Sequence, residues 1–371
     1  MDAQQTYSIA YLCGATGWGG LEMNQLRNAS WMQKRGYDVS IFCIENTPIY
    51  EKAKALGLPV RTIEKHRRYY DFAKAKALLN ALLKENIQHL IFRATVDMSL
   101  VATVKFLSKG KIKTHFFMEM EFGAPKKQFF RTLRYRYFDS WNCPLDFLKN
   151  QVLANAHVDP KKLNVIPSGL DLSAVINETK EASRETLHLP KDVFLFGLIG
   201  RFDPKKGQEL VIDAVQQIEN TNFHVVFVGE NTVDDKVNYD QLLKAKIEQA
   251  GLQKRFHFLP FQENPFRSFN AFDCTLMASD SETFGMVTIE SLAQGTPVIG
   301  SNAGGTPEIL EFGKTGLLYT TKSSTDLAAK MNAFLRAEFT IQPEKLKERA
   351  AYFNHENVCQ KVENLLAQHS K

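Results

Sequence analysis

The chain has 371 residues, of which 44% are hydrophobic and 23% are charged. This composition is typical of a soluble globular protein, and the length favours two domains over one. The 46 basic and 41 acidic residues leave a net charge of +5, an excess too small to indicate a nucleic-acid-binding protein.

Cysteine usage and hydropathy point to the cytoplasm. The five cysteines are scattered and form no CxxC spacing, which predicts reduced thiols. The first residues lack the basic and then apolar order of a signal peptide. No apolar run reaches the roughly 18–20 residues of a membrane-spanning helix. We therefore expect a cytoplasmic protein whose membrane contact, if any, is peripheral on the inner face.

Strand and helix patterns alternate along the first half. A short apolar strand is followed by a glycine-rich turn, Gly14–Gly20, and then by a helix that Gly36 ends, as C-terminal glycines often do. This order is typical of βαβ units around a mainly parallel sheet. The predicted elements are strands at 7–13, 39–44, 89–92 and 114–118 and helices at 21–35, 73–84 and 98–108.

A second set of elements with the same order begins after Pro190. The linker is placed at 168–190, which is charged and poor in apolar residues, and a last helix is predicted at 356–368. We expect an α/β fold of two Rossmann-like, doubly wound parallel-sheet domains that face each other across a cleft, with ligands beyond the carboxyl ends of the strands. The elements are strands at 193–199, 224–228, 255–259, 274–277 and 296–300 and helices at 208–217, 241–250 and 286–294.

The segment Ser281–Glu290 leads from a predicted strand into a predicted helix. Free backbone N–H groups at a helix start, reinforced by the helix dipole, can bind phosphate or sugar oxygens. Glu282 and Glu290 are eight positions apart, slightly over two helical turns, so both could project toward one side and hold vicinal hydroxyls. The alternative is a helix N-terminal charge and a solvated surface residue. The amides concerned belong to Phe284, Gly285, Met286 and Val287.

A second candidate cluster follows the strand that ends at Gly200. Arg201, Lys205 and Lys206 lie in the turn before the next helix. Arginine binds phosphate with a forked guanidinium and lysine as a point charge, so this turn could stabilise a diphosphate without a metal ion. A solvated basic turn is the alternative interpretation.

The glycine-rich turn after the first strand allows close approach of backbone to a phosphate. It is not a dinucleotide fingerprint, because Glu22 stands where the third glycine would be required. The nine histidines show no paired ligand spacing, so no metal site is predicted.

Together these residues resemble glycosyltransferase family 4, the retaining group-1 glycosyl transferases with a GT-B fold. The similarity covers nearly all of the second half in the expected order and is looser in the first half, where it rests on 17–22 and 165–171. The residues that carry it are Gly200-Arg201, Lys206-Gly207, the Glu282/Glu290 pair, 295–299 and Gly304-Gly305.

The resemblance implies a role for each of these residues. Arg201 and Lys206 would bind the donor diphosphate, and Glu290 the ribose hydroxyls. Glu282 and the 284–286 backbone would hold the transferred sugar. Gly19 and Gly20 would approach the diphosphate and the acceptor from the other domain. We expect front-face transfer in which the leaving diphosphate helps to deprotonate the acceptor, with Glu282 as a nucleophile the alternative.

The resemblance also implies the domain bounds and the chemistry. The acceptor-binding domain would comprise 1–170 with the final helix, about 355–371, packed back on it, and the donor-binding domain 171–354. Neither a metal nor another cofactor would be required. The family's His-Gly step after the strand at 114–118 is missing, and Glu119 or Glu121 is expected in that space.

The function expected from the resemblance is transfer of a hexose or N-acetylhexosamine from a UDP- or GDP-sugar to a glycan or glycolipid, in cell-surface polysaccharide or lipopolysaccharide synthesis. A non-catalytic nucleotide-sugar-binding protein and a GT-B-shaped epimerase are the alternatives. No nucleic-acid partner is expected. Basic and aromatic residues alternate in Lys126–Phe138 and in His66–Tyr70. Such stretches can form a surface that binds an anionic membrane or a phosphorylated glycan. The alternative is an ordinary amphipathic helix with its aromatic residues in the core.

Overall fold

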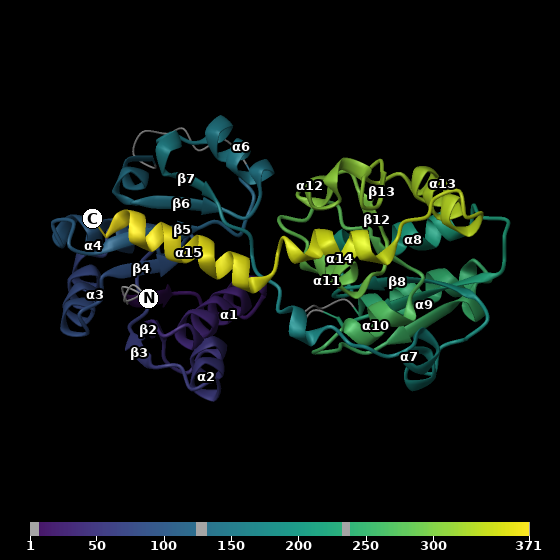
Figure 1. The fold of residues 1–371 in the computed structure, drawn as a ribbon, viewed down its shortest axis with the longest axis horizontal. Coiled ribbons are helices and arrows are strands. Elements are labelled where there is room, and N and C mark those ends of the chain that lie inside the picture. Colours follow the sequence, from purple (N-terminus) through teal and green to yellow (C-terminus); the bar gives the residue numbers. More distant parts are fainter. Residues whose placement is uncertain (1–6, 124–131, 232–237, 371) are drawn as a thin grey trace. The chain divides into compact units, whose positions relative to one another are not determined.

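The computed structural model describes residues 7–123, 132–231 and 238–370, and these form two α/β units. One unit contains the chain up to Gly169 together with the segment from His355, and the other is Leu170–Asn354 (Figure 1). Each unit is built around one parallel sheet. The expectation of two Rossmann-like α/β domains is therefore confirmed.

The first sheet has seven strands in the order β3-β2-β1-β4-β5-β6-β7. All neighbours run parallel, with Ile9 opposite both Val39 and His89. Helices cover both faces, which is why the central strands are almost continuously buried rather than alternating. The strands are β1 (Ser8–Cys13), β2 (Asp38–Ile44), β3 (Val60–Ile63), β4 (His89–Phe92), β5 (Lys113–Phe117), β6 (Ser140–Cys143) and β7 (Leu163–Val165).

The C-terminal helix α15 (His355–His369) belongs to the first unit, although its residues come last in the chain (Figure 1). It buries Val358, Val362 and Leu365, and Arg35 at the end of α1 donates to Glu363 at 2.7 Å. The other helices of this unit are α1 (Gly20–Lys34), α2 (Pro48–Ala55), α3 (Phe72–Lys84), α4 (Met98–Leu107) and α6 (Asp146–Asn155), with short 3₁₀ turns η1 (Leu133–Tyr137) and η2 (Pro160–Lys162).

The second sheet has six strands in the order β10-β9-β8-β11-β12-β13. They are β8 (Phe194–Ile199), β9 (Phe223–Val228), β10 (Phe256–Leu259), β11 (Cys274–Met277), β12 (Val298–Ser301) and β13 (Leu317–Tyr319). The helices are α7 (Lys180–Thr186), α8 (Gln208–Val215), α9 (Tyr239–Gln249), α10 (Phe266–Ala271), α11 (Met286–Gln294), α12 (Thr306–Ile309), α13 (Ser324–Leu335) and α14 (Pro343–Ala351), with 3₁₀ turns η3 (Leu172–Ala174), η4 (Pro204–Lys206), η5 (Gln253–Arg255) and η6 (Glu311–Gly313).

The prediction of a linker at 168–190 is wrong for most of that stretch. It contains η3 and α7, and it belongs to the second unit from Leu170 onward. Arg184 on α7 is buried, and its guanidinium lies 2.6 Å from the Asp273 carboxylate and donates to the Ala271 carbonyl. A charged segment can pack in this way because its buried cation finds both an anion and carbonyl acceptors.

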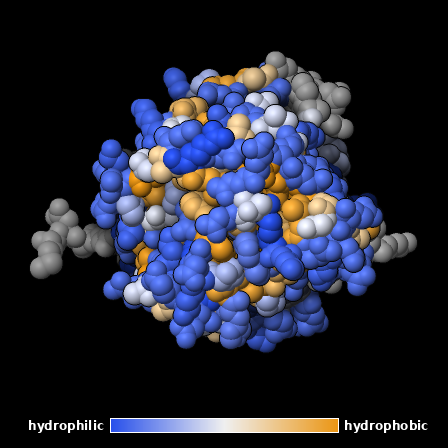
Figure 2. Space-filling model, turned by 90° about the vertical axis from the view of Figure 1, so that its right-hand side faces the viewer, coloured by the Kyte–Doolittle hydropathy of each residue, from blue (hydrophilic) through white to orange (hydrophobic). Residues whose placement is uncertain are grey.

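Among the helices of the described residues, none is both long and apolar enough to cross a bilayer. On the face shown in Figure 2, hydrophobic residues are interrupted by polar and charged ones. Singly exposed hydrophobic side chains are normal on a globular protein and indicate no particular partner.

Candidate active site

Loops from three neighbouring strands meet at the carboxyl edge of the second sheet. Lys206, after β8, places its ammonium 2.5 Å from Oε1 of Glu282, after β11. Ser279 donates its hydroxyl to the same carboxylate oxygen at 2.7 Å. The Lys206 and Glu282 side chains are 29% and 20% exposed, so both remain accessible to a ligand. Two of the predicted site residues, 76 positions apart, are thus brought together.

Glycines hold these loops at close range. Gly305 donates its backbone N–H to the Glu282 carbonyl at 2.7 Å. A Cβ on Gly304, whose φ is +60°, would lie 2.3 Å from that carbonyl oxygen. On the other side, a Cβ on Gly207 would lie 2.1 Å from the Ala278 carbonyl oxygen. The glycines at these two positions are therefore required because backbone packs directly on backbone.

The helix start predicted near Gly285 or Met286 is confirmed. Helix α11 begins at Met286 after Gly285, which has a φ of +73°. The N–H of Thr288 donates to the Gly285 carbonyl at 3.0 Å, which leaves the amides of Met286 and Val287 among the N-terminal donors without an acceptor inside the helix. Phe284 is buried, with its ring 5.6 Å from that of Phe353. The N-terminal end of the helix is therefore anchored to the core.

The eight-residue spacing of Glu282 and Glu290 is not a helical spacing. Glu282 lies in the loop before α11, and Glu290 lies within the helix, where it is half-buried. The argument from two helical turns is therefore wrong, since a loop with a left-handed glycine separates the two carboxylates. The position of Glu282 is determined by Lys206, Ser279 and the backbone contact with Gly305.

Arg201 directly follows Gly200 at the end of β8 and is exposed. Its carbonyl accepts a hydrogen bond from the amide of buried Gln208 at 2.9 Å. Within the described ranges, no carboxylate is within ion-pair distance of its guanidinium. The backbone is fixed while the charged group is free to meet an anion.

The remaining predicted donor residues, Gly19 and Gly20, lie in the first unit. Gly19 has an extended backbone and precedes α1, and Gly20 is the first residue of that helix. A Cβ on Gly20 would meet nothing within 4 Å, so the structure leaves open space at this helix start.

Glu119 and Glu121 occupy different surroundings. The Glu119 side chain, 9% exposed, forms an ion pair with Arg93, and its other oxygen accepts from Asn24 at 3.3 Å. Burial raises the pKa of Glu119, and Arg93 opposes that shift. Glu121 instead accepts from Gln151 on α6. The two carboxylates therefore do not belong to one site, and Glu119 is paired with the Arg93 cation.

Sequence reasoning missed Arg93 and Asp97, and it assigned His66 only to a basic and aromatic stretch, not to a buried contact. The Nε2 atom of His66 lies 2.8 Å from Oδ1 of Asp97, and both side chains are at most 1% exposed. Arg93 and Asp97 both follow β4. The position of polar residues just after a predicted strand was the available signal.

The basic and aromatic segment Lys126–Phe138 lies only partly within the described residues, because 124–131 fall outside them. In the described part, Thr132 is helical and Leu133–Tyr137 form the 3₁₀ turn η1. Tyr135 and Phe138 are 2% and 1% exposed, so these two aromatic rings belong to the core. Arg134 lies over the ring of Tyr69, with 5.4 Å between the guanidinium carbon and the ring centroid.

Among the described residues, no group of three or more His, Cys, Asp or Glu side chains is placed to hold a metal ion.

Comparison with known families gives a match in the second unit. Residues 179–352 match the family model described as "Glycosyl transferases group 1". This range contains all the predicted site residues from Arg201 to Glu290, including the Lys206–Glu282 pair. The match covers less than half of the chain.

Curated relatives include D-inositol 3-phosphate glycosyltransferases. The protein of this name from Mycobacterium marinum is 28% identical over 213 residues, which are 56% of this chain and 45% of the relative. The one from Mycolicibacterium paratuberculosis is 30% identical over 189 residues, which are 50% of this chain and 42% of the relative. The match thus spans less than half the length of these relatives.

Solved structures match the whole chain in fold. A glycosyltransferase from Rickettsia africae has a TM-score of 0.86 at 18% identity and covers 99% of both chains. HepE from Anabaena, solved with UDP, has a TM-score of 0.82 at 18% identity and covers 97% of this chain and 100% of its own. These structures are of the GT-B type. By its fold, the chain is a two-unit α/β protein of the GT-B type, and its second unit matches the family model for group-1 glycosyl transferases.

Proposed function

We propose that the chain is a glycosyltransferase that takes a hexose or N-acetylhexosamine from a UDP- or GDP-sugar, retains the anomeric configuration and uses no metal ion. The main support is the carboxyl edge of the second sheet, where Lys206 meets Glu282 in the loop that leads into α11. A cation, a carboxylate and a helix N-terminus match the diphosphate and the hydroxyls of a nucleotide-sugar. Relatives and fold neighbours named as glycosyltransferases support the same reaction class.

In this proposal, Arg201 and Lys206 neutralise the diphosphate as the bond to the sugar breaks. The Glu282 carboxylate, anchored by Ser279, holds hydroxyls of the transferred sugar, with the 284–286 backbone beside it. Glu290 accepts from the ribose. The diphosphate oxygen released on the same face of the sugar then helps to remove the acceptor proton.

The donor and acceptor classes are proposed from chemistry and from the named relatives. HepE was solved with UDP and with UDP-glucose, which favours a uridine donor over GDP. We propose a glycan or glycolipid acceptor of cell-surface polysaccharide or lipopolysaccharide synthesis. The lipopolysaccharide outer core galactosyltransferase WaaB, with a TM-score of 0.78 at 15% identity, has the same fold. The exposed basic and aromatic residues of the first unit would bring the enzyme to an anionic bilayer from the cytoplasmic side.

Thermal unfolding with and without nucleotides tests the donor site. UDP, GDP, UDP-glucose and UDP-N-acetylglucosamine are compared on wild type and on Arg201→Ala. Arg336→Ala is the matched control, since Arg336 is exposed at the end of α13, away from these loops. At least one nucleotide should raise the Tm of wild type and of the control but not of Arg201→Ala. If no nucleotide raises the wild-type Tm, the donor assignment is wrong.

Turnover is tested by transfer of labelled sugar from the stabilising donor to a panel of sugars, sugar phosphates and glycolipids. Donor binding without transfer or hydrolysis would favour a non-catalytic nucleotide-sugar-binding protein. Conversion of the donor sugar itself would favour an epimerase.

A further inference from the structure

A buried histidine and aspartate join two loops of the first unit at the carboxyl edge of its sheet. His66 lies in the loop 64–71 after β3, and Asp97 lies just before α4. Besides the 2.8 Å contact between His66 Nε2 and Asp97 Oδ1, the other Asp97 oxygen accepts the N–H of Gly14 at 3.1 Å. Three segments that follow β1, β3 and β4 thus meet at one carboxylate.

The hydrogen-bond partners of His66 define its protonation. Its Nδ1 lies 3.0 Å from the carbonyl oxygen of Arg67, and a carbonyl can only accept, so Nδ1 must carry a proton. Its Nε2 faces a carboxylate, so a further proton lies between Nε2 and Oδ1. The hydrogen bond to Asp97 raises the pKa of His66, and burial raises the pKa of Asp97. Both pKa shifts favour keeping this proton between the two groups, and the hydrogen bond to the Asp97 carboxylate, the largest influence on His66, favours its position on Nε2.

Gly14 is part of the same contact. A Cβ at this position would lie 2.2 Å from Asp97 Oδ1 and 2.5 Å from His66 Nε2. The first glycine of the glycine-rich turn is therefore required by the His66–Asp97 pair, which is a different reason from approach to a phosphate.

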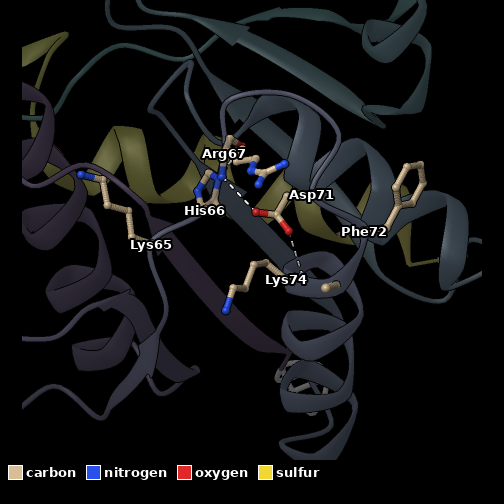
Figure 3. Close-up of a pocket in the computed structure, with 7 residues that line it drawn as sticks. Lys65, His66, Arg67, Asp71, Phe72 and Lys74 are labelled. Atoms are coloured by element: carbon tan, nitrogen blue, oxygen red, sulfur yellow. Dashed lines mark hydrogen bonds between the residues drawn. The ribbon is translucent and has the colours of Figure 1, made fainter.

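The loop 64–71 depends on this anchor. His66 is its only buried residue, and its neighbours Lys65 and Arg67 are exposed. The loop and the first turn of α3 together line a hollow of about 660 Å³ (Figure 3). Its other contacts lie nearer the surface: Asp71 accepts from the N–H of Arg67, Glu64 pairs with Lys74, and the Arg134 guanidinium lies over the ring of Tyr69.

We propose that His66, doubly protonated between Asp97 and the Arg67 carbonyl, is a positioning residue that keeps the basic loop 64–71 at the carboxyl edge of the first sheet for the acceptor side of the reaction. The pair and its effect on the loop stand independently of the proposed function, and only the acceptor role rests on it. Loss of one proton would leave Nε2 facing a carboxylate lone pair and would release the loop. The other titratable or charged groups near the pair are Asp71, which favours the cation, and Cys13 beside Asp97.

The first test uses the wild-type chain, so it does not depend on whether a variant folds. Nitrogen-15 NMR of the imidazoles should show His66 protonated on both nitrogens at pH 6.5 and above. Amide exchange of 64–71, corrected for intrinsic rates, should accelerate at least five-fold as that signal titrates at higher pH. A His66 that is neutral at pH 6.5, or exchange that does not follow its titration, would overturn the proposal.

The second test compares His66→Gln and Gly14→Ala with Gly123→Ala, a control glycine whose added Cβ would meet nothing within 4 Å. In His66→Gln and Gly14→Ala, the amide hydrogens of 64–71 should exchange at least five-fold faster at pH 6.5 than in wild type, and the control should match wild type. The Tm shift caused by UDP should be unchanged in all three. In the transfer assay, the KM for the acceptor should rise at least five-fold while the KM for the donor stays constant.

The possible failures can be told apart. Unchanged exchange, or equal changes in both KM values, would refute the positioning role of His66. If UDP causes no Tm shift and wild type transfers no sugar, the proposed function is refuted. The exchange and NMR results would still decide whether the His66–Asp97 contact holds the loop 64–71.

Discussion

The ammonium of Lys206 lies 2.5 Å from the carboxylate of Glu282, although the two residues follow different strands. Both side chains are partly exposed, and an ion pair of this kind contributes only about 0–1 kcal/mol to stability. A diphosphate could therefore draw Lys206 away from Glu282 at small cost. Donor binding would then free the carboxylate for the sugar hydroxyls in the same step.

Replacement of Lys206 by methionine should weaken UDP binding with little effect on folding. Loss of a hydrogen bond to a charged group costs about 1.5–3 kcal/mol, or about 10- to 150-fold in Kd. Lys254→Met, at an exposed position before β10, is the control and should bind as wild type. Isothermal titration calorimetry measures the difference, and equal Kd values would remove Lys206 from the diphosphate site.

Glu290→Gln and Glu282→Gln should have different effects. Glu290 is assigned to the ribose, so its change should weaken binding of UDP itself. Glu282 is assigned to the transferred sugar, so its change should leave UDP affinity within about two-fold and lower kcat with the intact donor, because a contact made to the reacting sugar is lost. Titration of UDP and steady-state kinetics separate the two. The assignments are reversed or wrong if Glu282→Gln is the variant that loses UDP.

Gly304→Ala should destabilise the second unit strongly. Its Cβ would lie 2.3 Å from the Glu282 carbonyl oxygen, and its φ is positive. Gly313→Ala is the matched control, since Gly313 also has a positive φ but no atom near a new Cβ. The control should cost about 1 kcal/mol from backbone strain alone, and Gly304→Ala about 2–4 kcal/mol because packing is also disrupted. Urea unfolding monitored by far-UV circular dichroism measures the loss in free energy of unfolding for both variants. Equal losses would show that the backbone contact has relaxed.

Two buried histidines should make the first unit sensitive to acid. His89 Nδ1 and His115 Nε2 lie 3.0 Å apart on adjacent strands. Burial lowers the pKa of His89 to about 4 and also lowers that of His115. An unfolded histidine titrates near 6.5, so between about pH 6.5 and 4 the unfolded chain binds more protons and stability falls as the pH falls.

The expected slope for that pair is up to about 1.4 kcal/mol per pH unit for each histidine. Urea midpoints of wild type and His115→Leu measured from pH 7 to 4 test this. The variant should be less stable at pH 7 but should lose less stability on acidification. His157→Gln, at an exposed position of the same unit, should follow wild type. Parallel curves for wild type and His115→Leu would contradict the assignment.

Local sequence was sufficient to predict the elements whose boundaries are set by consecutive residues. Helix 286–294 and its glycine boundaries were predicted because the strand, turn and helix signals are consecutive. The helical spacing argued for Glu282 and Glu290 failed because Glu282 lies in the loop before this helix, so the helical repeat does not relate the two carboxylates. The segment at 168–190 was taken for a linker because the partner of its buried arginine, Asp273, is 89 residues away.

The amino-acid sequence by itself determined the alternation of strands and helices, the two parallel sheets and the glycine, arginine and lysine positions after β8, since these depend on neighbouring residues. Only the tertiary structure decided that Lys206 meets Glu282, that Arg93 neutralises Glu119 and that Gly14 touches Asp97 and His66. The physical reason is that parallel strands distant in the sequence bring their carboxyl ends to one edge, where side chains from separate loops pair by charge and fit by shape.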